Sequence, residues 1–366
     1  MYFDTLRSFA MIFGVFFHAH QFAPNVASKM VWQTSWAFRM AAFFFVSGLL
    51  FSVVLEKRGL AAILRRRAVA IGVPLIAGFL TIVPVLKWAT NAVKAYPERS
   101  EGFLDTLIGT YTFQYENVFS HLWFLLALLI YIPLAAVVVE MMQARQLAGR
   151  LATYYDRHRL FWGQVGFVAS IALLCGVLHF LVQTADLDAQ IDNTAVIIVH
   201  HLPFFLLGAM SWLCFKNFEK LLIIDWRLIL LWVLLLGVHL LTRGDVPYAV
   251  TYAFKGALNM IGTLQLLAFF RRFANWDGPI SRGVSRSIYT VYLFHYPILA
   301  LLAYGTVRIG MERGIIYYFA SVAIALALSF ALHFAVIERV PLLKFLYNGR
   351  WGFTGSFLRR RRAESR

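Results

Sequence analysis

The stretch MYFDTLRSFAMIFGVFFHAHQF, residues 1–22, decides the fold of this chain. Its apolar residues run almost without a break, except for Arg7 and, eleven positions later, His18. Eleven positions make about three turns at 3.6 residues per turn, so the two side chains lie on one helix face, about 16 Å apart along the axis. Because a cation and an imidazole are costly to bury in a membrane helix, this spacing predicts a functional pair.

Composition places the chain among membrane proteins. Its 366 residues are 60% hydrophobic, and the mean hydropathy is +0.69. Charged residues make up 14%, against about 25% in an average soluble domain. The apolar residues form long blocks rather than the short alternating strands of a membrane barrel. We therefore predict an all-α, polytopic membrane protein.

The apolar blocks predict about ten transmembrane helices, each close to the roughly 20 residues that cross the hydrocarbon core. They cover residues 8–23, 36–55, 69–86, 121–141, 161–182, 194–215, 226–242, 247–270, 286–307 and 315–337. Residues 1–340 are interpreted as a single membrane domain. Residues 341–366 are interpreted as a basic cytoplasmic tail, which contains the run Arg359–Arg362.

The basic residues predict the orientation. With the N-terminus in the cytoplasm, the inside segments hold 25 of the 34 Lys and Arg residues and the outside loops hold eight. This asymmetry follows the positive-inside rule and predicts that both termini are cytoplasmic. Because the basic residues cluster at helix ends, the net charge of +16 is explained by topology and does not indicate a nucleic-acid partner.

Two charged residues near the first span extend the Arg7 and His18 pattern. Asp4 lies three residues before Arg7, a spacing at which the two side chains can pair on a helix. Arg39 begins the second span in FRMAAFFFVSGLL and is either an interfacial anchor or a residue that faces the same cavity as His18. The alternative interpretation of the pair itself is structural, with Arg7 as a membrane-surface anchor and His18 as a hydrogen-bonded interior residue.

Polar residues in two later spans are further candidates. His121 and Trp123 lie in HLWF at the outer start of the fourth span, where a polar acceptor would arrive. His295 lies in FHYPIL on the ninth span, and Pro297 frees a backbone carbonyl near it. The two cysteines, Cys175 and Cys214, fall in different spans, so the sequence indicates neither a disulfide framework nor a metal site.

These segments together resemble the acyltransferase 3 family of integral membrane acyltransferases. The resemblance covers essentially the whole chain. It is carried, in chain order, by DTLRSFAMIFGVFFHA (4–19), FRMAAFFFVSGLLFS (38–52), LRRRAVAIGVPL (64–75), HLWFLLALL (121–129), YLFHYPIL (292–299) and VIERVP (336–341).

The resemblance implies transfer of an acetyl or succinyl group from cytoplasmic acyl-CoA to a hydroxyl of an extracytoplasmic glycan, in the bacterial inner membrane. Acyl-CoA is then a co-substrate, and neither a bound cofactor nor a metal is required. Arg7 and His18 match the Arg-x10-His pair of the family. Members often show R-x-x-R before the third span, whereas here the second arginine falls on Ala70 and the basic run is Arg65–Arg67.

Chemistry assigns a role to each candidate. A neutral His18 would act as general base toward the acceptor hydroxyl, or would carry the acyl group as a covalent intermediate. The guanidinium of Arg7 and those of Arg65, Arg66 and Arg67 would bind the phosphates of coenzyme A. Arg39 and Trp123 would stabilise the thioester oxygen. The predicted substrate-binding residues are Asp4, Arg39, His121, Trp123 and His295.

Two other classes of function stay open at this point. Ten spans with interior histidines also suit a transporter or flippase of a polar or lipid-linked solute, although we find neither an inverted repeat nor a matched pair of broken helices. A non-catalytic membrane scaffold is the third alternative. The sequence also leaves open the identity of the acceptor and the choice between acetyl and succinyl.

Overall fold

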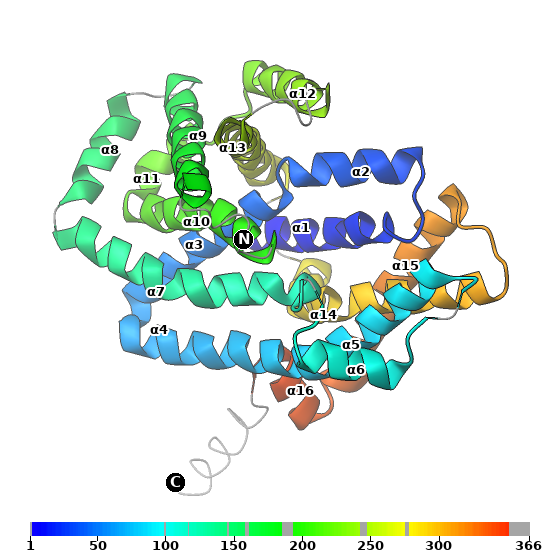
Figure 1. Cartoon of the computed structure of the whole chain (residues 1–366). Coiled ribbons are helices and arrows are strands. Elements are labelled where there is room, and N and C mark those ends of the chain that lie inside the picture. Colours follow the sequence, from blue (N-terminus) through cyan, green and yellow to red (C-terminus); the bar gives the residue numbers. More distant parts are fainter. Residues whose placement is uncertain are drawn as a thin grey trace, which may run out of the picture.

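The computed structural model describes residues 2–98, 100–115, 117–144, 146–157, 161–184, 193–241, 247–274 and 278–350, and within these ranges it contains helices and no β-strand. The helices are α1 (Tyr2–Ala19), α2 (Val26–Trp36), α3 (Arg39–Arg58), α4 (Leu60–Arg67), α5 (Val73–Ala95), α6 (Phe103–Tyr111), α7 (Trp123–Ala144), α8 (Leu147–Arg157), α9 (Phe161–Thr184), α10 (Asn193–Leu213), α11 (Phe215–Phe218), α12 (Trp226–Leu241), α13 (Tyr248–Phe273), α14 (Pro279–Arg308), α15 (Ile315–Leu332) and α16 (Pro341–Asn348). Helix α1 lies in the middle of the bundle and packs against α2, α3, α13, α14 and α15 (Figure 1).

The membrane spans agree with the predicted architecture. Eight helices in the described ranges are long and apolar enough to cross a membrane, and there are nine when the bent pair Phe215–Leu221 and Trp226–Leu241 counts as one span. These nine correspond in order to the second through tenth predicted spans. The first predicted span corresponds to α1, which is not among the nine. The prediction of an all-α, polytopic membrane fold is confirmed.

The basic segment before the third span is helical rather than a loop. Helix α4 continues through a π-helical turn, Ala68–Gly72, into α5, so the apolar span extends over Leu60–Ala95. Pro74 stands at the start of α5. Because proline has no N–H and its ring crowds the preceding turn, the wider π-helical turn accommodates it without ending the helix. The arginines of the basic run therefore have fixed positions along a helix.

The long loop after α5 turns back into the bundle. Helix α6 runs antiparallel to α5, because the ring of Phe103 lies 6.0 Å from that of Trp88 and the Tyr111 hydroxyl donates a hydrogen bond of 2.6 Å to the carbonyl of Leu80. A short 3-10 turn, Ser120–Leu122, then leads into α7. Leu122 packs on Gly78, in the middle of the Leu60–Ala95 helix. This path carries His121 deep into the bundle.

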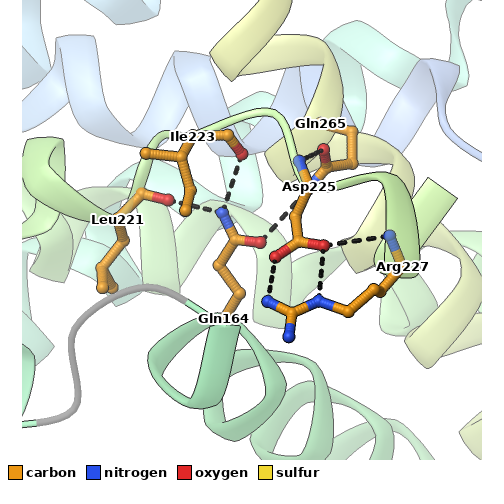
Figure 2. Close-up of polar contacts among 6 residues, drawn as sticks. All are labelled: Gln164, Leu221, Ile223, Asp225, Arg227 and Gln265. Atoms are coloured by element: carbon orange, nitrogen blue, oxygen red, sulfur yellow. Dashed lines mark hydrogen bonds and ion pairs between the residues drawn. The ribbon is translucent and has the colours of Figure 1, made fainter.

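The break between α11 and α12 is held by a network of side chains (Figure 2). The two flanking segments meet at 75°. The side-chain amide of Gln164 on α9 donates to two carbonyls freed by the break, those of Leu221 at 2.5 Å and Ile223 at 3.0 Å. Gln265 on α13 donates to Gln164 at 3.2 Å. The freed carbonyls are therefore satisfied inside the protein, which a broken membrane helix requires.

The same network fixes the start of α12. The backbone N–H of Asp225 donates to the side-chain oxygen of Gln265 at 2.9 Å. The Asp225 carboxylate accepts two bonds from the Arg227 guanidinium, at 3.0 and 2.7 Å, and a third from the Arg227 backbone at 2.9 Å. Such a bidentate pair adds directional rigidity to its charge attraction. Helix α12 is thereby anchored to α9 and α13 at one end.

The segment that begins the predicted tail is attached to the bundle. Helix α16 packs on α5, and the hydroxyl of Tyr347 lies 3.0 Å from that of Thr81. Gly349 follows in the left-handed conformation, with φ +61°, against the backbone of Ala70. Residues 351–366, which include the run Arg359–Arg362, lie outside the described residues.

Helices α3 and α10 touch at two glycines. A Cβ on Gly48 would come within 1.9 Å of the carbonyl oxygen of Phe205, and a Cβ on Gly208 within 2.0 Å of that of Phe45. Ser52 adds a hydrogen bond of 2.9 Å to the carbonyl of Ala209. Small residues that permit such close backbone approach are typical of helix pairs in membranes. This contact fixes α10 beside α3, on which Arg39 stands.

We expect Gly208→Ala to destabilise the protein by about 1–3 kcal/mol, because the added methyl meets backbone that cannot rotate away. Gly305→Ala on α14 is the matched control, since its Cβ would meet nothing within 4 Å. The measurement is the thermal unfolding midpoint of the purified protein in detergent. Equal midpoints for the two variants would contradict the close contact.

Candidate active site

A cavity of about 110 Å³ lies where α1, α3, α7, α10 and α14 meet. That volume holds several water molecules, since one needs roughly 10–15 Å³ by this measure. Imidazoles, one guanidinium and aromatic rings dominate its wall. The lining residues are Met11, Gly14, Phe17, His18, Ser35, Trp36, Arg39, Met40, His121, Trp123, Phe124, Ile197, His201, Tyr292 and His295.

Three predicted histidines meet in this cavity. The ring centre of His18 lies 5.3 Å from that of His295 and 6.5 Å from that of His121. The centres of His121 and His295 are 6.0 Å apart. His121 and His295 are buried, with 5% and 3% of their surface exposed. Three segments far apart in the sequence thus bring their imidazoles to one point.

Pro297 explains how His121 is held. A proline cannot donate the helical hydrogen bond to the carbonyl four residues earlier, which here is the carbonyl of Leu293. The Nε2–H of His121 donates to this freed oxygen at 3.1 Å. The Tyr292 hydroxyl, in turn, donates to the backbone carbonyl of His121 at 2.6 Å. The predicted free carbonyl beside Pro297 therefore exists, and it fixes the ring of His121.

His295 is held by its own helix. Its Nδ1 lies 2.8 Å from the carbonyl of Val291, one turn earlier, so Nδ1 carries the proton and donates it. Its Nε2 is buried and has no hydrogen-bond partner among the described residues, and the same is true of His121 Nδ1. Each of the two rings therefore presents one unpartnered nitrogen.

Arg39 faces the cavity rather than the membrane surface. It is 9% exposed, and its guanidinium carbon lies 4.6 Å from the ring centre of Phe17 on α1. The side chain passes over Gly14, where a Cβ would come within 2.4 Å of Nη1. Within the described part of the chain, Arg39 forms no salt bridge with an acidic side chain. A buried guanidinium without a carboxylate partner is available for an anionic ligand.

The other end of α1 carries the second predicted residue. Arg7 and His18 lie in one continuous helix, as their spacing predicts, but Arg7 does not line the cavity. Its guanidinium carbon lies 5.2 Å from the ring centre of Phe43 on α3. The ring of Phe43 contacts that of Phe124 on the cavity wall, with their centres 4.6 Å apart. Arg7 thus stands behind the cavity wall.

The basic run lies at the same end of α1 as Arg7. Arg67 is half-buried and close enough to Arg7 for their charges to interact, whereas Arg65 and Arg66 are exposed. Asp4 is exposed, and no ion pair joins it to Arg7 in the described residues. The structure therefore separates the predicted residues into a cavity group and a basic group.

Several residues at the cavity escaped sequence reasoning. His201 lines it, with its ring 5.8 Å from that of Trp123 and its Nδ1 donating to the carbonyl of Ile197 at 2.8 Å. Tyr292 lines it as well, and the ring of Tyr296 lies 4.2 Å from that of His18. The sequence YLFHYP, residues 292–297, places two tyrosines around His295, and that motif was the available signal.

The described residues offer no arrangement of three His, Cys, Asp or Glu side chains suited to a metal ion. What the cavity offers instead is nitrogen lone pairs and one guanidinium, enclosed by aromatic rings. Such a site can accept a proton from a hydroxyl group and can bind an anionic group.

Comparison with known proteins agrees with this chemistry. The chain matches the family described as "Acyltransferase domain" over residues 2–334. It is 26% identical to "Glucans biosynthesis protein C" of Escherichia coli strain K12 and of strain K12 / DH10B, and 25% identical to that of strain O6:K15:H31 (536 / UPEC). Each alignment of 386 residues covers 95% of this chain and 94% of the relative. No solved structure is significantly similar. A membrane bundle with an imidazole-lined cavity and a family match over nearly its whole length identify this chain as a member of the acyltransferase 3 family, a membrane-embedded acyltransferase.

Proposed function

We propose that this acyltransferase moves an acetyl or succinyl group from cytoplasmic acyl-CoA to a hydroxyl of an extracytoplasmic glycan, with His18 as general base. The observation that carries the proposal is the meeting of His18, His121, His295 and Arg39 in one buried cavity. The name of the relatives, which refers to glucan biosynthesis, supports a glycan acceptor. Because acyl-CoA is a cytoplasmic metabolite, the membrane in question is the one that bounds the cytoplasm, the bacterial inner membrane.

The donor binds at the basic end of α1. Arg7 and Arg67 lie close together there, and Arg65 and Arg66 extend the positive charge along α4. Guanidinium groups bind phosphates through charge-assisted, often bidentate hydrogen bonds, so these residues hold the phosphates of coenzyme A. Arg7 and His18 are eleven residues apart, about 16 Å along the helix axis. The flexible arm of coenzyme A spans that separation and brings the thioester to the cavity.

The reaction is a proton-neutral acyl transfer. A nitrogen of His18 takes the hydroxyl proton while the acceptor oxygen forms a bond to the thioester carbon. The carbon–sulfur bond then breaks, and the protonated His18 returns the proton to the sulfur of the leaving coenzyme A. The products are an ester and a thiol, and the imidazole is restored. Trp123, on the cavity wall, is the candidate donor to the oxygen on which negative charge develops.

Arg39 favours an acyl group that ends in a carboxylate. It is buried in the cavity and forms no salt bridge within the described residues. A succinyl group brings one carboxylate, which would pair with this guanidinium by charge-assisted hydrogen bonds. An acetyl group brings none and would leave Arg39 to interact with the thioester oxygen, as the sequence first suggested.

The transport alternative is distinguished by stoichiometry. A transporter or flippase moves an intact solute and leaves the thioester whole. An acyltransferase releases one free thiol for each ester formed. Purified protein in proteoliposomes with acyl-CoA inside and glycan outside separates the two functions, since only acyl transfer couples thiol release inside to a mass increase of the glycan outside.

We expect His18→Ala to insert and fold but to lose acyl transfer, because no other group in the proposal removes the hydroxyl proton. The measurements are thiol release and the mass of the acylated glycan. His20→Gln is the matched control, because His20 lies on the same segment but hydrogen bonds to Ser28 and does not line the cavity. Transfer by His18→Ala at the parental rate would refute the mechanism.

We expect Arg7→Gln and Arg67→Gln to raise the KM for acyl-CoA about 10- to 100-fold, the loss expected for hydrogen bonds to charged groups. The KM for the corresponding acyl-pantetheine, which lacks the phosphates, should stay unchanged. Arg308→Gln, an exposed arginine at the far end of α14, is the control. An equal rise in both KM values would place these arginines outside the phosphate site.

We expect Arg39→Gln to lower kcat/KM for succinyl-CoA at least about 10-fold more than for acetyl-CoA, because one ion pair to the acyl carboxylate is lost. Arg39→Lys, which keeps a positive charge, should retain part of the preference. Equal losses for both donors in Arg39→Gln would show that the guanidinium does not read the end of the acyl group.

A further inference from the structure

The inference concerns what orients His18, and it rests on the proposed function. Within the described part of the chain, the His18 imidazole forms no hydrogen bond, although it is the proposed base. General bases in enzymes are commonly held in one tautomer by a third group, which also stabilises the imidazolium that forms. The cavity should therefore contain an acceptor for one N–H of His18.

Two of the neighbouring imidazoles have their tautomers set by backbone carbonyls. His295 donates from Nδ1 to Val291, and His121 donates from Nε2 to Leu293. A carbonyl oxygen only accepts, so these nitrogens carry the protons. In the neutral rings, His295 Nε2 and His121 Nδ1 are consequently acceptors, and both are buried without a partner among the described residues.

Those two acceptors cannot satisfy each other, because neither has a proton to share. His18, by contrast, has an N–H in either of its tautomers. A buried polar atom that stays unpaired costs about 1–3 kcal/mol, so there is a free-energy gain in pairing one of these acceptors with His18. The ring of His295 is the nearer, with a centre-to-centre distance of 5.3 Å to His18 against 6.5 Å for His121.

We propose that His295 is the positioning residue for the base: its Nε2 accepts an N–H from His18 when the substrates are bound. The resulting chain runs from the Val291 carbonyl through His295 to His18 and ends at the acceptor hydroxyl. Hydrogen bonds of this kind are often long in ligand-free sites and shorten in the complex. His295 thereby determines which nitrogen of His18 is free to take the hydroxyl proton.

Tyr296 limits how far His18 can turn away. Its ring lies 4.2 Å from that of His18, centre to centre, at an interplanar angle of 31°. Its hydroxyl donates to the side-chain oxygen of Gln21, on the turn after α1. That turn is itself fixed by Asn25 and Ser28, whose side chains and backbones hydrogen bond reciprocally. The ring of His18 is thus confined on one side and left free to reach His295 on the other.

The test compares His295→Phe with His295→Gln. We expect His295→Phe to lower kcat roughly 100-fold, less than the roughly 10⁴-fold loss for a charged orienting group. Both KM values should change by less than about threefold, because substrate binding is untouched. His295→Gln should recover at least about 10-fold in kcat, because its amide oxygen can accept the N–H of His18.

His200→Gln is the matched control. His200 is as deeply buried, at 5% exposed, but it does not line the cavity, and its ring lies near His179 and Tyr252 between α9, α10 and α13. Loss of this buried imidazole should leave kcat unchanged. A merely structural role for His295 predicts instead that the Phe and Gln variants are equally impaired and have lowered unfolding midpoints.

A double variant separates positioning from direct catalysis. If His295 acts through His18, His18→Ala combined with His295→Phe should be no slower than His18→Ala alone. A parental kcat in His295→Phe, or a large kcat loss in His121→Phe without one in His295→Phe, would overturn the inference. Both results would leave the proposed function intact, which fails only if the parent protein does not transfer acyl groups.

Discussion

The hydrogen bond from His121 to the carbonyl of Leu293 is the interaction on which the site depends. In a bundle surrounded by lipid, a backbone carbonyl without a partner costs several kcal/mol, so a proline inside a helix must be compensated. Pro297 creates such a carbonyl on α14, and an imidazole from the segment before α7 satisfies it. One local defect in a helix therefore ties the folded-back segment to α14 and sets the tautomer of a cavity histidine.

The second constraint is the close approach of backbones around α1 and α3. Gly14 lets the Arg39 side chain cross α1, and the glycine pair of α3 and α10 places α10 against α3, with His201 on the cavity wall. A larger residue at these positions would displace either the guanidinium or a helix backbone. The cavity is thus polar inside because small residues allow polar side chains to enter it, while the aromatic rings of Phe17, Trp123 and Phe124 exclude bulk water.

Much of this arrangement followed from sequence, and the missing part has a physical reason. Helical periodicity alone placed Arg7 and His18 on one helix face, and Pro297 announced a free carbonyl. The pairing of Asp4 with Arg7 was wrong, because Asp4 lies on the exposed surface of α1 while Arg7 turns inward toward Phe43. The basic segment before the third span was predicted as a loop, because the span was assigned from hydropathy and arginines lower hydropathy without breaking a helix. His201 and Tyr292 reach the cavity through tertiary packing, which no spacing rule within one helix encodes.

Proton balance explains why an enclosed cavity suffices for the proposed chemistry. The proton that leaves the acceptor hydroxyl is the one that the departing thiolate needs, so no proton has to reach water during turnover. A base that is oriented but isolated from solvent is then an advantage, because water in the cavity would compete with the hydroxyl for the thioester. On this account the second buried histidine group, His179 and His200 across α10 from the cavity, is not needed to carry protons away. The imidazoles that matter are those whose lone pairs open into the cavity, and the backbone carbonyls of α14 select them.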